Sequence, residues 1–305
     1  MSFHRAGHSR DGAPVADNGR IRDSRVVRVL AMGRIGNSIA LAKASWQVLK
    51  ADKELLLLPV ISMAATVVTL ALFFIPIAIG GFNGTNFLLL VVMYFILAYI
   101  TIFFNAALVS AAHERLAGGD PTIGSALRGA ASRAGRILPW ALISALVSAI
   151  LRTIEERAGI LGSIVIRMVG MAWTVVTFLV LPIIVIEGKG AGEAIKGSVN
   201  LFRRTWGENL GAQVGLGIVG FLASLPGVAL IILGVVSGGG AATGISIGLG
   251  ALWMLVVIVV MSALSGIFQT ALYHFAVDGQ APQGYFDNRI MTEAFRTKRG
   301  RRFGR

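Results

Sequence analysis

The chain has 305 residues, of which 55% are hydrophobic and only 14% are charged, whereas about 25% are charged in an ordinary soluble domain. It has a net charge of +13 and no cysteine, which excludes disulfides, thiolate metal ligands and cysteine nucleophiles. Nucleic acid is not predicted as a partner, because the basic residues lie in the tails and in the short loops beside long apolar runs. This pattern is typical of an integral membrane protein.

The polar N-terminal residues 1–35 combine many arginines with few apolar side chains, which predicts a disordered basic tail. A helix follows over residues 38–53, where Ile39, Ala42, Trp46 and Leu49 recur at helical spacing. Such a stripe indicates an amphipathic helix at the membrane interface, with the half-polar ring of Trp46 as an anchor. Trp206, which also precedes an apolar run, is predicted to be a second anchor.

Apolar runs long enough to cross a bilayer, which takes about 20 residues, recur through residues 36–278. The sequence therefore predicts an all-α integral membrane protein with six transmembrane helices, near residues 55–80, 87–112, 137–154, 164–186, 210–236 and 245–275. The third is the shortest, but omitting it would place the basic C-terminal tail, residues 279–305, across the membrane from the other basic segments.

The basic residues concentrate in both tails and in the segments after the second and fourth spans. The positive-inside rule then predicts that both termini are cytoplasmic, in the inner (plasma) membrane of a bacterium. The basic tails are expected to bind anionic lipid headgroups, since each Lys or Arg near such a surface contributes about 1 kcal/mol. A partner protein or a second copy of the chain is compatible with this arrangement.

Short similarities suggest an internal repeat. Ser38-x-x-Leu41-x-Lys43-x-Ser45-Trp46 matches the segment 198–206, Phe104-Asn105-x-Ala107-Leu108 matches 268–272, and a fainter middle copy links 126–130 with 194–198. We interpret these as three copies of one unit, a basic amphipathic cytoplasmic helix followed by a transmembrane hairpin. Chance similarity in a sequence rich in Ala, Leu and Gly is the alternative.

Polar side chains inside the predicted spans are the candidate functional residues. Asn105 and Gln269 lie within the second and sixth spans and are predicted to face the interior, because an unpaired amide in lipid costs several kcal/mol. They could join helices by hydrogen bonds, or they could line a substrate path. A charged cluster is predicted at the outer ends of the third and fourth spans, either as locally paired charges or as a ligand-binding ring: Arg152, Glu155, Glu156, Arg157 and Arg167.

Catalytic signatures fail on inspection. His113-Glu114-Arg115-Leu116-Ala117 begins like the zinc-protease motif H-E-x-x-H, but alanine replaces the second histidine. His113 and His274 lie near cytoplasmic span ends, where interfacial solvation is favoured over a shared metal site. No catalytic residue, metal or cofactor is predicted.

The favoured function is a non-catalytic protein that organises the membrane or binds a partner. The alternatives are a small-molecule or lipid transporter or permease subunit, and, less favoured, an intramembrane enzyme.

The segment from Ser45 to Pro59, with its order of tryptophan, lysine, acid and leucine, resembles the opening of an uncharacterised family of bacterial multi-pass membrane proteins, a domain of unknown function. The resemblance runs from about residue 38 to residue 278. A more distant similarity is to the membrane domain attached to some glycerophosphodiester phosphodiesterases. Neither resemblance implies catalytic residues.

Overall fold

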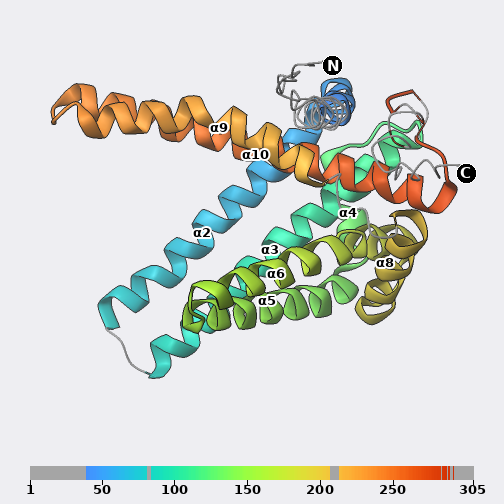
Figure 1. Cartoon of the computed structure of the whole chain (residues 1–305), viewed down its shortest axis with the longest axis horizontal. Helices are drawn as coiled ribbons and strands as arrows, with labels where there is room; N and C mark the ends of the chain where they lie inside the picture. The colour runs from blue at the N-terminus through green and yellow to red at the C-terminus, as the bar shows by residue number, and fades with distance from the viewer. Residues whose placement is uncertain are drawn as a thin grey trace, which may run out of the picture.

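The computed structural model describes residues 39–80, 84–206, 213–282, 284–286, 288 and 291, and all regular structure in this part of the chain is helical (Figure 1). Among these described residues, six helices are long and apolar enough to cross a membrane, the predicted third one included. After a first helix at residues 39–51, the elements in chain order are η1 (Lys53–Leu56), α2 (Leu57–Gly80), α3 (Gly84–Leu116), α4 (Ile123–Ala131), α5 (Ala134–Arg157), α6 (Ile160–Val176), α7 (Val180–Pro182), η2 (Ile183–Glu187), α8 (Ala191–Trp206), α9 (Gln213–Val236) and α10 (Ala241–Asp278).

The long helices form three hairpins, α2/α3, α5/α6 and α9/α10, and α6 continues through α7 and η2. The first helix, α4 and α8 lie at the end of the spans where the chain passes from one hairpin to the next (Figure 1). We call this end the connector end, and the opposite end, where each hairpin reverses, the turn end. The predicted start of the fifth span at residue 210 lies outside the described residues.

The core lies toward the connector end, where the second arms of the three hairpins meet. Buried residues run through 106–109 of α3, 179–185 of α7 and η2, and 266–273 of α10. The rings of Phe178 and Phe268 lie 6.3 Å apart at the contact between two of these arms. The predicted tail after residue 278 contributes to the same core, since the side chains of Ala281, Phe286 and Met291 are buried there.

The α9/α10 hairpin packs closely within itself but extends away from α2/α3 toward its turn end (Figure 1). A Cβ atom added at Gly250 would lie 2.8 Å from the carbonyl oxygen of Gly227, so the two backbones touch directly. The indole Nε1 of Trp253 also donates to the carbonyl of Ala223, at 2.9 Å. The outward faces of this hairpin stay exposed and apolar, as lipid-facing surfaces must be.

The first helix buries one face against the rest of the protein, formed by Leu41, Ala42, Ser45, Val48 and Leu49. The predicted stripe only partly coincides with this face. Ile39 is 52% exposed and Trp46 is 38% exposed, and the Lys50 ammonium lies 5.7 Å from the Trp46 ring. Trp46 therefore lies on the outer side, where an interfacial anchor would meet headgroups. The side chain of Trp206 and the predicted tail at 1–35 lie outside the described part of the chain.

Candidate functional site

A cleft of about 250 Å³ opens where α9/α10 diverges from the first hairpin. Three helices, α2, α3 and α10, supply its walls. We call it the intramembrane cleft, and its lining consists of Pro59, Ser62, Met63, Thr66, Thr101, Phe104, Asn105, Leu108, Ile258, Val259 and Ser262.

The walls of the intramembrane cleft are mostly apolar and include a few polar, uncharged groups. Hydroxyl groups come from all three helices, including Thr66 of α2, Thr101 of α3 and Ser262 of α10, and Asn105 supplies an amide. No side chain in this lining carries a formal charge. Thr101, Ser262 and Ile258 are exposed, so the space is open at its side and is not a sealed cavity.

Asn105, one of the two predicted intramembrane amides, lies half-buried in this cleft. Its side chain has no hydrogen-bond partner among the described residues, although an amide left unpaired in an apolar medium costs several kcal/mol. A Cβ atom added at Gly266 of α10 would lie 3.5 Å from Asn105 Oδ1 and 2.8 Å from Leu108 Cγ. The glycine thus lets α10 approach α3 closely beside Asn105 and Leu108, two residues that line the cleft.

Gln269, the other predicted amide, lies in the packed core and has a different role. Its Nε2 donates a hydrogen bond to the carbonyl of Phe178. Pro182 follows Phe178 by four residues and has no N–H, so a regular helix could not supply a donor to this carbonyl. The structure therefore does not bring Asn105 and Gln269 together. One amide lines the cleft, and the other satisfies a carbonyl that a proline leaves free.

The fourth span is broken between α6 and α7, and a side chain from α8 holds the two pieces. The Ser198 hydroxyl donates to the Val176 carbonyl at 2.5 Å and accepts from the Leu179 N–H at 3.3 Å. Ser198 is fully buried. Sequence reasoning placed a continuous helix here. Pro182 was the visible signal of a break, but the sequence gives no indication that Ser198 and Gln269 repair it.

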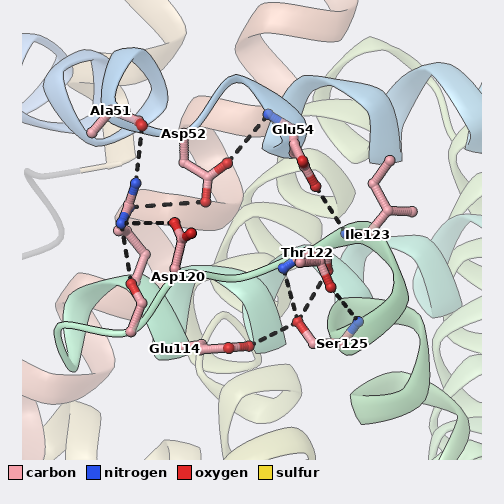
Figure 2. A network of polar contacts seen from close by, with 10 residues as sticks. Ala51, Asp52, Glu54, Glu114, Asp120, Thr122, Ile123 and Ser125 are labelled. Atoms are coloured by element: carbon pink, nitrogen blue, oxygen red, sulfur yellow. Dashed lines mark hydrogen bonds and ion pairs between the residues drawn. The ribbon is translucent and has the colours of Figure 1, made fainter.

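A polar network fastens the first helix to the connector end of α3 (Figure 2). The guanidinium of Arg115 donates to the carbonyls of Ala51 and Gly119, at 2.9 and 3.1 Å. Its Nε lies 3.8 Å from Asp52 Oδ2, and Asp52 is 6% exposed. Burial raises the pKa of Asp52 above its ordinary value, while the positive charge of Arg115 acts in the opposite direction.

The same network continues into α4 (Figure 2). Glu54 Oε2 accepts from the Ile123 N–H at 3.2 Å, and Glu114 Oε2 accepts from the Ser125 hydroxyl at 2.9 Å. The Thr122 hydroxyl accepts from the Ser125 N–H in a capping box that begins the helix. These contacts fix the connectors relative to the spans, which makes the network a structural clasp.

His113 and His274, 161 residues apart, are neighbours in the fold. His113 Nδ1 lies 2.9 Å from His274 Nε2, and the rings are stacked with their centroids 5.0 Å apart. His274 Nδ1 also lies 3.4 Å from Asp278 Oδ2. Within the described residues, no three His, Cys, Asp or Glu side chains group so that they could hold a metal ion. The pair instead joins the connector ends of α3 and α10.

The predicted outer cluster lies at the turn end of α5 and α6 and forms two ion pairs. Arg167 Nε lies 2.6 Å from Glu155 Oε1, and Arg152 Nε lies 3.4 Å from Glu156 Oε1. Arg157 takes part in neither pair. Arg152, Arg167 and Glu156 are mostly exposed, and such surface pairs contribute about 0–1 kcal/mol each. The geometry fits local pairing better than a ligand-binding ring.

Comparison with known protein families adds a classification. A family described as a "Family of unknown function (DUF6159)" matches residues 85–283, from the start of α3 to just beyond α10. The chain belongs to this family. No curated protein matches the chain. The predicted membership of an uncharacterised family is confirmed for residues 85–283, but the segment 45–59 that suggested it precedes the match. Nothing supports the predicted likeness to the membrane domain of glycerophosphodiester phosphodiesterases. Of the cleft's three helices, α3 and α10 lie within the DUF6159 match and α2 precedes it.

Proposed function

We propose that this DUF6159 protein is a non-catalytic membrane protein that takes an amphiphilic molecule from the bilayer into the intramembrane cleft and so organises lipids or a membrane-borne partner. The observation that carries the proposal is an open cleft between diverging hairpins, whose mostly apolar lining includes hydroxyl and amide groups. Ligand sites are typically apolar with a few well-placed polar groups. The Asn105 amide, which has no partner among the described residues, would gain one from an occupant.

The binding proposal is tested by asking what the extracted protein carries. Native mass spectrometry of the protein in mild detergent should show a bound amphiphile. Ser262→Trp fills the cleft and should reduce the bound fraction several-fold. Ser148→Trp is the matched control, because Ser148 is exposed on α5, outside the cleft. Equal occupancy in both variants, or no bound species in the parent, would contradict the proposal.

A transporter or permease subunit is the second candidate, and the broken fourth span favours it. Discontinuous helices whose freed backbone groups meet a substrate are a feature of many transporters. Here, however, Ser198 and Gln269 already occupy the freed carbonyls of Val176 and Phe178. A co-purifying water-soluble solute, in place of an amphiphile, would favour transport.

The three-copy architecture is part of the same proposal. Glu114, Glu187 and Asp278 each close the second arm of a hairpin, and the residues nine positions earlier are Asn105, Phe178 and Gln269. If the copies are aligned on these acids, the hydrogen bond from Gln269 to Phe178 joins equivalent positions of two copies. The convergence of all three second arms in one core supports a parallel arrangement of the repeats.

The proposal places the connector end in the cytoplasm of a bacterial cell, with both termini inside. The basic residues of the connectors and tails support this orientation, and the tails would bind anionic lipid. A reporter active only outside the cytoplasm should be active when fused at Gly239, between α9 and α10, and inactive when fused at Arg305. Activity at Arg305 would overturn the orientation.

A further inference from the structure

We propose that the occupant of the intramembrane cleft is an uncharged lipid carrying a hydroxyl and ester carbonyls, the chemistry of a diacylglycerol. This inference rests on the proposed function, that the cleft binds an amphiphile, and it adds the chemical class. It draws on the depth of the polar groups, the absence of charge in the lining, and the hydrogen-bonding capacity that the lining leaves open.

The polar groups of the cleft lie deep in the hydrocarbon layer. Asn105 precedes His113 by eight residues on α3, and Ser262 precedes His274 by twelve on α10. Thr66 follows Glu54 by twelve residues. At about 1.5 Å per residue, these positions lie roughly 12–18 Å from the polar connector end, and half the hydrocarbon core is about 15 Å thick. Three helices thus present polar groups at one depth, near the bilayer midplane.

A charged headgroup does not suit this depth. A charged group at the centre of the bilayer is strongly disfavoured unless it is paired, and the lining of the cleft offers no cation to pair with a phosphate. Hydroxyl and ester groups are neutral, and hydrogen bonds to the lining can satisfy them. The polar part of the occupant is therefore uncharged.

The open hydrogen-bonding capacity matches such a lipid. The Asn105 amide can donate to an ester carbonyl and accept from a hydroxyl. The Thr101 hydroxyl already donates to the Leu97 carbonyl at 2.9 Å, so it can act toward a ligand only as an acceptor, through its two lone pairs. A volume of about 250 Å³ suits the glycerol end alone, while the acyl chains leave through the open side past Ile258.

The test uses the full-length protein in phosphatidylcholine nanodiscs that contain a photoactivatable diacylglycerol. A photoactivatable phosphatidic acid with identical acyl chains serves as the charged comparison. The diacylglycerol should label peptides containing residues 62–66, 101–108 or 258–262 at least five-fold more than the phosphatidic acid. Asn105→Leu and Thr66→Val should each lower this labelling several-fold, and Ser148→Ala, outside the cleft, should leave it unchanged.

The outcomes separate this inference from the proposed function. Equal labelling by both probes would overturn the uncharged class but leave an amphiphile-binding cleft. If neither Asn105→Leu nor Thr66→Val lowers the labelling of the cleft by the diacylglycerol, the polar side chains of the lining do not bind the lipid. If neither probe labels the cleft while Ser262→Trp still displaces a co-purified species, the occupant is not a glycerolipid. If Ser262→Trp displaces nothing, the proposed function itself fails.

Discussion

Replacing Gln269 with Leu should lower the free energy of unfolding by about 1–2 kcal/mol, because it leaves the partly buried carbonyl of Phe178 without a donor. Pro182 has no N–H, so the helix itself cannot supply a substitute donor to this carbonyl. The measurement is the apparent melting temperature of the detergent-solubilised protein, followed by the loss of soluble monomer on heating.

Asn105→Leu is the matched control for this prediction, since it makes the same chemical change at a similar depth in another span. Asn105 has no hydrogen-bond partner among the described residues, so its replacement breaks no hydrogen bond there and should not lower the melting temperature. In a Pro182→Ala background, the new N–H at position 182 can reach the Phe178 carbonyl, and the loss caused by Gln269→Leu should shrink. Equal losses for Gln269→Leu and Asn105→Leu would contradict the distinction between the core amide and the cleft amide.

Arg115→Leu should destabilise the protein more, by about 2–3 kcal/mol near neutral pH. The change removes the donors to Ala51 and Gly119 and leaves the carboxylate of Asp52 buried without its nearby positive charge. Arg115→Lys should recover only part of the loss, because an ammonium cannot reproduce the guanidinium fork. The readout is again the melting temperature.

The loss should also depend on pH. Burial already raises the pKa of Asp52, so its contribution to stability is largest when the carboxyl is protonated and declines as pH rises through the folded-state pKa. Removing Arg115 raises that pKa further and enlarges the decline. The difference between Arg115→Leu and the parent should therefore be smaller near pH 4 than at pH 8. Asp52→Asn combined with Arg115→Leu should remove this dependence, and a pH-independent loss in Arg115→Leu alone would contradict the explanation.

The six spans could be predicted from the sequence because a run of about 20 apolar residues is specified locally. The third span is short enough that its length alone did not establish that it crosses the membrane. It was predicted because omitting it would place the basic C-terminal tail across the membrane from the other basic segments. The face that each helix buries was harder to predict. On the first helix, Trp46 belongs to an apolar stripe yet lies outward, because an apolar side chain can face lipid as well as protein.

The site depended on long-range pairings that no local pattern encodes. Asn105 and Gln269 look equivalent as amides inside apolar runs, and only the packing of α3, α7 and α10 separates their roles. Pro182 indicates that the carbonyl of Phe178 lacks its helical donor, but the donor that replaces it, Gln269, lies 91 residues away along the chain. The partnership of His113 with His274 spans 161 residues. The cleft itself exists because α9/α10 diverges from α2/α3, and that angle is set by tertiary contacts.

The two hydrogen bonds that satisfy the broken fourth span form only after later parts of the chain have been synthesised. Ser198 is made 22 residues after Val176, and Gln269 is made 91 residues after Phe178. At about 5–20 residues per second, the first carbonyl waits roughly 1–4 s for its donor and the second roughly 5–18 s. During that interval the fourth span has left the ribosome with a carbonyl that its own helix cannot satisfy. A nascent chain that stops before the sixth span thus holds a backbone carbonyl that water or a lipid headgroup must satisfy until α10 arrives.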